Sequence, residues 1–431
     1  MTRLRILSAL PMLALLAACG DSSQQTPDQI GANPVLPEPQ QDILPSMAIA
    51  EPADWNGATP SVPEGFTVTR LAGDLLGPRR ILALPNGDIL VAETSGGKEP
   101  IARPKDLIAG IIKGMGKSAV PGGNRITLLR DTNGDGQPDL RTVLVEGLKS
   151  PYDMVFVDNA LYVANTDSIV RFPLTPGETE ITDPGTIITE LPAGEINHHW
   201  TKAMALSADG TKLFVGIGSN SNITERGMDA ERDRALVWQV DRRTGEHRAF
   251  ATGLRNPSGL AVNPTTGQLW AVVNERDELG PNLVPDYLTS VQDGAFYGWP
   301  FSYWGQHIDP RVHPQNPDLV LRAVMPDYSL GSHVAPLGIA FSSGGAFGDG
   351  VFVGEHGSWN RTDFAGYKVV FIPFSGGKPA GDPVDFVTGF LDGEGHARGR
   401  PVGVALDTTG ALLIADDLSN TIWRVSRAPG S

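Results

Sequence analysis

The chain has 431 residues, a formal net charge of −15 at pH 7, 51 glycines, 35 prolines and one cysteine. An acidic chain without a basic cluster is a poor partner for nucleic acid, so nucleic-acid binding is excluded. A single cysteine cannot form an internal disulfide, and the high glycine and proline content indicates frequent turns and few long helices.

The first residues predict export and a lipid anchor. Arg3 and Arg5 precede an apolar run that ends at Ala18 and is shorter than the ~20 residues of a membrane-spanning helix. Leu-Ala-Ala-Cys, ending at Cys19, resembles the lipobox of bacterial lipoproteins. We therefore predict a lipoprotein signal peptide over residues 1–18, lipidation of Cys19 and a membrane-anchored protein in the bacterial periplasm; an ordinary cleaved signal is the alternative.

Residues 19–63 are rich in proline, glutamine and small residues and have no sustained apolar period. Such a composition is typical of a disordered linker. We expect a tether that joins the lipidated cysteine to a domain over residues 64–427.

Within that domain one pattern recurs: a turn containing Gly, Asp or Asn, a short apolar strand and a polar break. The copies are LPNGDILVAET from 84, VDNALYVANTD from 157, LSADGTKLFVGIGS from 206, VNPTTGQLWAVVNERD from 262, GGAFGDGVFVGEHGS from 344 and LDTTGALLIADD from 406. Repeated hairpins predict an all-β fold, a six-bladed β-propeller, because a β-sandwich would need shorter and more even spacing. FTVTRLA at 66–72 is expected to pair with TIWRVS at 421–426 and close the ring, while 98–124 and 279–335 do not fit the pattern.

The stretch DTNGDGQPD places oxygen ligands at alternate positions around glycines. Asp131, Asn133, Asp135 and Asp139, with the carbonyl of Gln137, would suit calcium, which takes six to eight oxygens. The glutamate that completes an EF-hand is missing, so a polar turn between strands is the alternative. NERDELGPN at 274–282 and DGAFYGWP at 293–300 offer similar oxygen chemistry or a solvated acidic loop, and spacing alone does not decide between them.

A set of arginines stands beside the turns of the repeats. The set comprises Arg255 in GLRNPSG, Arg361 in HGSWNR, and Arg398 and Arg400 in HARGRPVG. If these guanidinium groups face one end of the ring, they form a pocket for a multiply anionic ligand, since arginine holds carboxylates in bidentate fashion. Each one alone is explained equally well by a surface salt bridge.

These motifs together resemble sugar dehydrogenases that depend on pyrroloquinoline quinone (PQQ), nearest to the L-sorbosone dehydrogenase-like branch and more distantly to soluble glucose and aldose sugar dehydrogenases. The segments that carry the resemblance, in this order, are EINHHWTKAMALSADGTKLFVGIGS, GLRNPSGLAVNPTTGQLW, NERDELG, YGWP, HGSWNRTDFAGYKVV and RGRPVGVALDTTGALLIADD. The family folds as a six-bladed propeller, in agreement with the repeat count.

The resemblance implies a role for each motif. His199 would be the general base that takes the proton of the anomeric hydroxyl while hydride passes to the quinone, and an imidazole with a pKa of ~6.5 suits that task. The residues implied in holding the three carboxylates of the quinone are Arg255, Asn256, Arg361, Arg398 and Arg400.

Calcium is also implied. One ion on the quinone would be held partly by backbone carbonyls near Arg276 and Asp277, and a separate structural ion by Glu278 and the carbonyl of Tyr297. The chain departs from the glucose dehydrogenases in three places: His198 replaces an aspartate, Ser258 replaces a glutamine, and the loop before Asp277 is shorter.

The sequence therefore predicts a PQQ- and calcium-dependent dehydrogenase that oxidises an aldose or a sorbosone-like sugar aldehyde and passes electrons to a quinone or cytochrome. No GxGxxG fingerprint of a nicotinamide enzyme is present. The alternatives are a calcium-dependent propeller lactonase or esterase and a non-catalytic binding propeller, since the fold alone would serve each of them.

Overall fold

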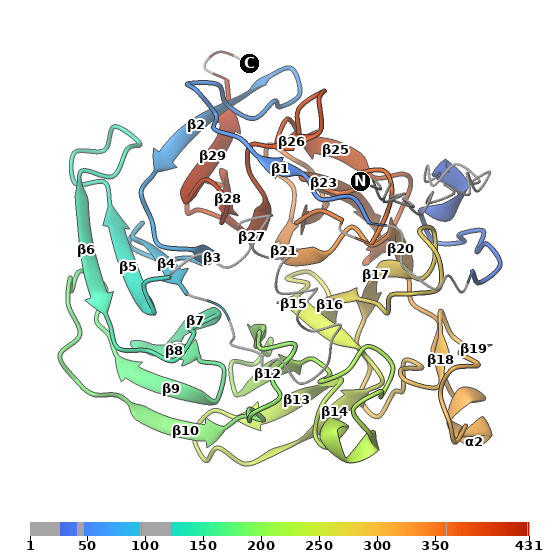
Figure 1. The fold of residues 1–431 in the computed structure, drawn as a ribbon. Coiled ribbons are helices and arrows are strands. Elements are labelled where there is room, and N and C mark those ends of the chain that lie inside the picture. Colours follow the sequence, from blue (N-terminus) through green and yellow to red (C-terminus); the bar gives the residue numbers. More distant parts are fainter. Residues whose placement is uncertain are drawn as a thin grey trace, which may run out of the picture.

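The computed structural model of the protein describes residues 26–40, 47–94, 96, 122–358, 360–428 and 430. Over these ranges the chain forms six antiparallel sheets around a central axis (Figure 1), which confirms the predicted all-β six-bladed β-propeller. The predicted signal peptide, the lipidation site Cys19 and most of the 98–124 stretch lie outside the described residues.

Blades 1 to 5 take their strands in chain order from the axis outwards, whereas the outermost strand of blade 6 comes from the beginning of the propeller. Blade 1 has β3 (Pro78–Ala83), β4 (Ile89–Glu93), β5 (Arg125–Arg130) and β6 (Leu140–Val145). Blade 2 has β7 (Asp153–Val157), β8 (Ala160–Ala164), β9 (Ser168–Pro173) and β10 (Thr186–Glu190). Blade 3 has β11 (Met204–Leu206), β12 (Lys212–Ile217), β13 (Leu236–Asp241) and β14 (His247–Thr252). Blade 4 has β15 (Asn256–Val262), β16 (Leu269–Asn274), β17 (Pro285–Ser290) and β20 (Tyr328–Ser332). Blade 5 has β21 (Pro336–Ser342), β22 (Gly350–Glu355), β23 (Lys368–Ser375) and β25 (Val384–Val387), with β24 (Lys378–Pro379) at its edge. Blade 6 has β27 (Pro401–Leu406), β28 (Leu412–Asp416), β29 (Thr421–Arg427) and β2 (Phe66–Ala72). The six hairpins predicted from the sequence are the first two strands of the six blades.

Hydrophobic cores lie between neighbouring blades, and the strand sequence explains why. Successive side chains of a strand point to opposite faces. In β16, Leu269, Ala271 and Val273 pack against blade 3, whereas Trp270 and Val272 pack against blade 5. A strand buried on both faces reads as a continuous apolar run, as the repeated hairpins do.

Close approach of the inner strands requires glycine at certain positions. A Cβ atom on Gly338 of β21 would lie 2.2 Å from the carbonyl oxygen of Val402, and one on Gly403 of β27 would lie 2.3 Å from that of Arg79. Any side chain at these two sites would push blade 5 from blade 6, or blade 6 from blade 1. The inner strands consequently pack tightly around the axis.

The ring is closed by the strands that were predicted to close it. β2 pairs antiparallel with β29, in a register that runs from Phe66 opposite Arg427 to Ala72 opposite Ile422. Blade 6 therefore combines the first long strand of the propeller with its last three strands.

The 279–335 stretch is only partly the long connection that the sequence predicts. It contains β17 and β20, which are the two outer strands of blade 4. The segment between them forms the hairpin β18 (Ser302–Tyr303) and β19 (His307–Ile308) and the short helix α2 (Pro317–Val320). Phe296 and Phe301 pack inside this segment, whereas Tyr297, Tyr303 and Trp304 join the core between blades 3 and 4.

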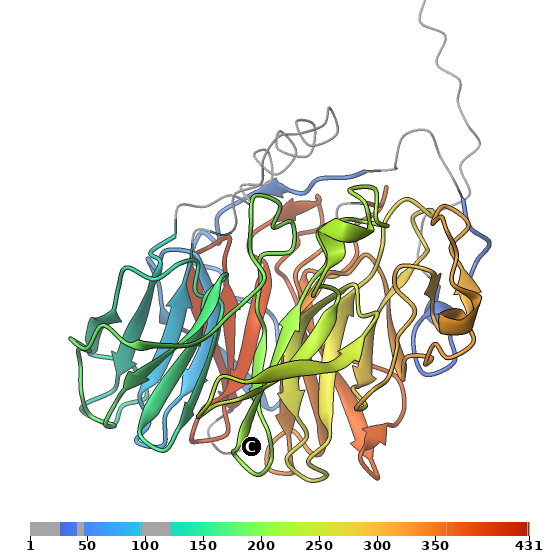
Figure 2. The ribbon, with the colours of Figure 1, turned by 90° about the horizontal axis from the view of Figure 1, so that it is seen from below.

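An N-terminal segment, residues 26–40 and 47–62, packs along the propeller and crosses the end that is uppermost in Figure 2. After the 3₁₀ turn η1 (Pro27–Gln29), Gly31 exchanges backbone hydrogen bonds with Ser329 of β20, and the amide of Gln40 donates to the carbonyl of Leu279 at 2.9 Å. Strand β1 (Glu51–Pro52) then pairs with β26 (His396–Ala397) in parallel. This packing differs from the free tether that the composition predicts, because proline-rich chain can still donate backbone hydrogen bonds and bury occasional apolar side chains.

The N-terminal segment should therefore stabilise the propeller. Ile30 and Leu36 pack against two of the cores, and losing them should cost about 2 kcal/mol. We expect a chain that begins at Ala53 to melt roughly 3 °C below one that begins at Thr26, as measured by scanning calorimetry. Leu36→Ala in the longer chain should give part of this decrease, and equal melting temperatures for the two chains would contradict a stabilising role.

Candidate active site

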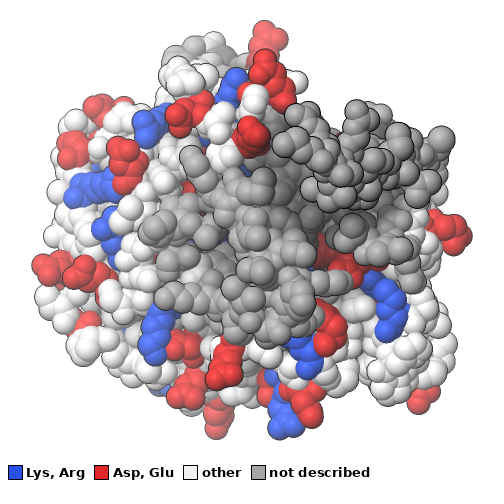
Figure 3. Space-filling view, in the orientation of Figure 1, with Lys and Arg blue, Asp and Glu red and all other residues white. Residues whose placement is uncertain are grey.

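Residues from all six blades meet at one end of the ring, the end uppermost in Figure 2. Each inner strand begins there, opposite the end of the second strand of its blade; for example, Asn256 lies opposite Asn274 and Pro401 opposite Asp416. We call it the site end. Figure 3 shows that basic and acidic side chains alternate around its rim.

A buried polar plug closes the axis below the site end. The guanidinium of Arg80 and the hydroxyl of Tyr152 both donate to the carbonyl of Ser258, at 2.7 and 2.9 Å. Arg80 lies over the Tyr152 ring at 5.0 Å and faces Asp153 at 3.4 Å. These contacts join blades 1 and 2 to blade 4 across the axis.

His199, the predicted base, stands at the site end with a defined orientation. Its Nδ1 lies 2.7 Å from the carbonyl oxygen of Ser219, so Nδ1 carries the proton and donates it. Nε2 is left as the accepting nitrogen, which is the form that a general base needs. Burial, the adjacent His198 and the positive charge of Arg255 hold the pKa of His199 well below its usual value, so the ring is neutral at neutral pH.

Asn256 and Gly218 lie beside His199. A Cβ atom on Gly218 would be 2.4 Å from Oδ1 of Asn256 and 2.5 Å from Cβ of His199, so only glycine permits this arrangement. Oδ1 of Asn256 is buried and accepts no hydrogen bond within the described part of the chain. A buried acceptor without a donor is costly unless a ligand supplies one.

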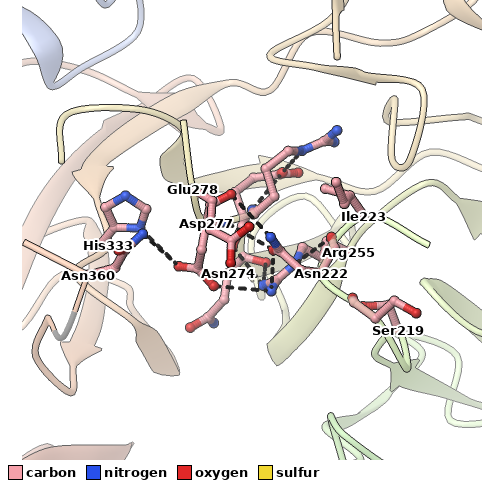
Figure 4. A network of polar contacts seen from close by, with 12 residues as sticks. Ser219, Asn222, Ile223, Arg255, Asn274, Asp277, Glu278, His333 and Asn360 are labelled. Atoms are coloured by element: carbon pink, nitrogen blue, oxygen red, sulfur yellow. Dashed lines mark hydrogen bonds and ion pairs between the residues drawn. The ribbon is translucent and has the colours of Figure 1, made fainter. Parts of the chain in front are cut away.

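Arg255 organises a network rather than an open anion pocket (Figure 4). Its guanidinium donates to the carbonyl and the side-chain oxygen of Asn222, at 3.3 and 3.0 Å, and to the carbonyl of Glu275 at 2.7 Å. It also approaches the carboxylate of Asp277 at 3.5 Å. Arg255 thus fixes the loop after β12 to the loop after β16.

Asp277 is a partly buried carboxylate, with 18% of its side chain exposed, whose contacts are long. His333 and Asn360 approach it at 3.4 and 3.5 Å (Figure 4), beyond the ~2.7–2.9 Å of a charge-assisted hydrogen bond. Nε2 of His333 faces the carbonyls of Gly280 and Leu283, at 3.1 and 3.2 Å, so both of its nitrogens face acceptors. Burial opposes the charge of His333, but the hydrogen bond and the charge of Asp277 outweigh it and raise the pKa of His333.

Arg276 holds the inserted segment of blade 4 onto the propeller. Its fully buried side chain pairs with Glu275 at 3.0 Å and Asp309 at 3.2 Å, and donates to the carbonyls of Pro300 and Ser302. Asp309 also pairs with Arg311 at 2.7 Å. Arg311 donates to the carbonyls of Asp277 and Glu278, both at 3.1 Å, so these two carbonyls already have a donor.

Blades 1, 5 and 6 contribute a second charged cluster at the site end. Asp417 contacts Arg79 at 2.8 Å, His356 at 3.1 Å and Arg400 at 3.5 Å. Burial opposes its charge, but the three basic groups outweigh burial and keep the pKa of Asp417 well below its usual range. Arg79 also lies over the indole of Trp200, at 5.6 Å from the ring centre, which brings this cluster next to the His199 segment.

The other predicted residues are distributed unevenly. Arg398 is about one-third exposed and lies 3.7 Å from Asp392. Arg361 is fully buried, donates to the carbonyl of Pro281 at 2.6 Å and pairs with Asp363 at 3.0 Å. Tyr297 is buried and donates to the carbonyl of Ser290 at 2.6 Å, and burial raises its pKa to about 12. All four predicted arginines thus lie in segments at the site end, where Arg361 pairs with Asp363 and Arg398 faces Asp392.

The loop with Asp131, Asn133, Asp135 and Asp139 connects β5 to β6 at the opposite end of the ring. Its side-chain oxygens accept hydrogen bonds from the loop itself: Asp131 from the amides at 134 and 136, both at 2.7 Å, Asn133 from the amide at 135, and Asp139 from Thr132. This is the pattern of a polar turn. Calcium binding here stays a prediction of the sequence.

The side chains at the site end fit a carboxylate-bearing quinone. Oδ1 of Asn256 requires a hydrogen-bond donor, and Nε2 of His199 is free to accept a proton. The guanidinium groups of Arg79 and Arg400 share the single carboxylate of Asp417. For calcium, Asp277 retains coordinating capacity because its contacts are long. Within the described residues, no three His, Cys, Asp or Glu side chains form a group that could hold a metal ion.

Sequence reasoning missed Arg79, Asn222 and Ser219. Arg79 follows the turn before an inner strand, as Arg255 and Arg400 do, and this position was the available signal. Ser219 acts through its backbone carbonyl and Asn222 through a contact between loops, and neither kind of contact can be recognised from a sequence motif.

Comparisons with known proteins agree with this geometry. A family model described as Glucose / Sorbosone dehydrogenase matches residues 75–355, and one described as TrAA12-like matches 318–428. A Borreliella burgdorferi protein is 27% identical over 296 residues, covering 65% of this chain and 77% of its own length. The PQQ-dependent pyranose dehydrogenase of Coprinopsis cinerea is 24% identical over 294 residues, 54% of this chain and 40% of that protein.

Solved structures show the same fold. The holo PQQ domain of the Coprinopsis cinerea pyranose dehydrogenase superposes with a TM-score of 0.70 at 20% identity, covering 88% of this chain and all of that domain. The soluble aldose sugar dehydrogenase of Escherichia coli in its apo form gives 0.55 at 18% identity, covering 84% of this chain and all of that one.

Fold and site together define an oxidoreductase, a sugar dehydrogenase of the PQQ type. The chain belongs to the glucose/sorbosone dehydrogenase family. No helix in the described ranges is long and apolar enough to cross a membrane.

Glu355, at the end of β22, is a buried carboxyl close to the site end. Its Oε2 finds no hydrogen-bond partner within the ranges that the structure describes. Burial raises the pKa of Glu355 to about 8, so the neutral acid is present at neutral pH. The nearby Asp286 behaves similarly, since burial raises its pKa to about 7.

This carboxyl predicts a pH dependence of stability. An unfolded glutamate titrates near ~4.3, so between that pH and about 8 the folded state binds the extra proton and the free energy of unfolding falls as pH rises. Glu355→Gln should remove a slope of up to about 1.4 kcal/mol per pH unit, leaving the part that Asp286 contributes. Urea unfolding across this range would measure both slopes, and parallel curves for the two proteins would refute the assignment.

Proposed function

We propose that the protein oxidises an aldose or a sorbosone-like sugar aldehyde, with PQQ as hydride acceptor and calcium beside it. The observation that carries the proposal is His199: its Nδ1 is fixed on the carbonyl of Ser219 at 2.7 Å, which leaves Nε2 as the accepting nitrogen, and the unsatisfied oxygen of Asn256 lies beside Gly218 as His199 does. The names of the relatives, which include aldose sugar dehydrogenase and pyranose dehydrogenase, support the substrate class.

The quinone, when bound, supplies the acceptor for the hydride of the sugar carbon. Arg400 and Arg79 would hold its carboxylates, because the single carboxylate of Asp417 leaves positive charge in excess between them. The side-chain amide of Asn256 would contact its polar edge. The plug of Arg80 and Tyr152 keeps bulk water from entering the site along the axis.

His199 would take the proton from the sugar hydroxyl at Nε2. The ring begins neutral because burial and the charges of His198 and Arg255 disfavour its protonated form. The carbonyl of Ser219 accepts the Nδ1 proton and stabilises the imidazolium once it has formed. The hydrogen bond from Nδ1 to the Ser219 carbonyl thus both orients the imidazole ring and stabilises its positive charge.

Calcium, in this proposal, would lie near Asp277 and the carbonyl of Arg276. Asp277 is the carboxylate with the long contacts, and a hard divalent cation would replace Asn360 and His333 as its partners. The ion would supply Lewis-acid polarisation to the quinone. The second, structural ion at Glu278 and Tyr297 is supported by the sequence motif alone.

Dye-linked oxidation tests the proposal directly. With added quinone and calcium, the protein should reduce an electron-accepting dye in the presence of one or more sugars of a panel. His199→Ala should lower kcat by about 10²–10⁴-fold, the usual contribution of a general base. Arg400→Ala should weaken quinone binding, measured by calorimetry on the apoprotein, by roughly tenfold or more.

Arg424→Ala is the matched control, since Arg424 pairs with Asp407 away from the site end and its loss should not change quinone affinity. No quinone binding by the wild-type protein would overturn the proposal. Hydrolysis of lactones or esters would then favour the hydrolase, and neither activity would favour a binding propeller.

We also propose that the protein is a lipoprotein of the periplasmic face, which would place it near a membrane quinone or cytochrome as electron acceptor. The support is the apolar run and the Leu-Ala-Ala-Cys sequence that ends at Cys19.

Metabolic labelling with a radioactive fatty acid tests the anchor. The wild-type protein should carry label and sediment with membranes, whereas Cys19→Ala should carry none. Lipoproteins carry more than one acyl chain, and several chains together anchor a protein stably, whereas a single chain holds it only weakly. Because the variant carries none, it should appear in the soluble fraction. Unlabelled wild-type protein would show that the cysteine is incidental.

A further inference from the structure

Arg234 is a buried cation behind the candidate base that the proposed chemistry does not use. It follows the 3₁₀ turn η2 (Met228–Glu231) and precedes β13, and only 7% of its surface is exposed.

The guanidinium joins the two segments that hold His199. Nη1 donates to the carbonyl of Gly218 at 3.2 Å, and Nη2 donates to Oδ1 of Asn197 at 2.9 Å and to the carbonyl of Pro192 at 3.0 Å. Asn197 stands two residues before His199, and Gly218 directly precedes Ser219. Arg234 therefore ties the base to the residue that fixes its tautomer.

The contacts beyond Arg234 leave little room for movement. Nδ2 of Asn197 donates to Oγ1 of Thr166 at 2.8 Å, and that hydroxyl donates to the carbonyl of Trp200 at 2.9 Å. Trp200 also accepts from the fully buried Lys202 at 3.1 Å. With Gly218 already in tight contact with His199, a shift of either segment moves the imidazole.

Arg234 also contributes charge. The charged groups that face His199 are His198, Arg255 and Arg234, all of which disfavour the imidazolium. The counter-charge of Arg234 is Glu231, whose carboxylate is turned to the amide of Asn220 at 2.7 Å. Burial lowers the pKa of Arg234 to about 10, which still leaves it charged at neutral pH.

We propose that Arg234 is a positioning residue for His199, which fixes the Nδ1–H tautomer and keeps Nε2 available to the substrate. The proposal rests on the proposed function in taking His199 as the base. Three acceptors on two segments match the planar fork of arginine, and a lysine has no equivalent set of directed donors.

The first experiment observes His199 without turnover. Nitrogen-15 spectra of histidine-labelled apoprotein should show His199 as the Nδ1–H tautomer in the wild type. Arg234→Met should yield a mixture of tautomers and a higher His199 pKa, because a nearby positive charge has been removed. Arg234→Lys should restore the pKa but not the single tautomer.

The second experiment is the pH profile of the quinone-loaded enzyme. Arg234→Met should lower kcat by up to about 10²-fold, as expected for a displaced catalytic group, with little change in KM. The acid limb of kcat/KM should move to higher pH. Arg242→Met is the matched control, since Arg242 is a partly buried arginine of the same blade that donates to the carbonyl of Gly210 at the opposite end.

A purely structural role would lower the melting temperature but leave the tautomer and the acid limb unchanged, and that result would overturn the proposal. If Arg234→Met does not fold, Asn197→Ala removes one of the three acceptors and should give a smaller change in the same direction. The wild-type protein could also prove inactive while His199 still has a single tautomer, which becomes a mixture in Arg234→Met. That result would refute the proposed function and support this inference.

Discussion

Ring closure between β2 and β29 is the constraint on which the site depends. Arg79 and Asp417 are separated by nearly the whole domain in sequence, yet they form a 2.8 Å ion pair at the site end. That contact joins the first blade to the last, and the last blade is complete only when the first long strand, β2, pairs with β29. The hairpins fold locally, but the site is a property of the closed ring.

Positive charge gathers at the site end of a strongly acidic protein. Asp417 is shared by two arginines and a histidine, and Asp277 by Arg255 and His333. In each cluster the cations outnumber the carboxylates. Burial and the charges of His198, Arg255 and Arg234 keep His199 neutral, so Arg255 contributes both to the positive charge that would attract an anionic cofactor and to the neutral state of the base.

Most of the fold could be predicted from the sequence, because each hairpin is encoded by adjacent residues. His199 and Asn256 could be assigned because short motifs surround them. Asn222 and the carbonyl of Ser219 could not, since their roles arise from contacts between loops of different blades. The predicted anion pocket is likewise altered by a long-range contact: Arg361 donates to the carbonyl of Pro281, 80 residues away in sequence, which sequence spacing does not reveal.

The packing of the N-terminal segment limits how far the propeller can stand from a membrane. The residues from Gln29 onward are hydrogen-bonded to the domain, so they cannot serve as a flexible linker. Only seven Cα-to-Cα steps separate Cys19 from Thr26, a fully extended reach of about 25 Å. With a lipid on Cys19, the domain would rest close to the headgroups, and electrons leaving the propeller would have a short distance to travel to a carrier in the bilayer.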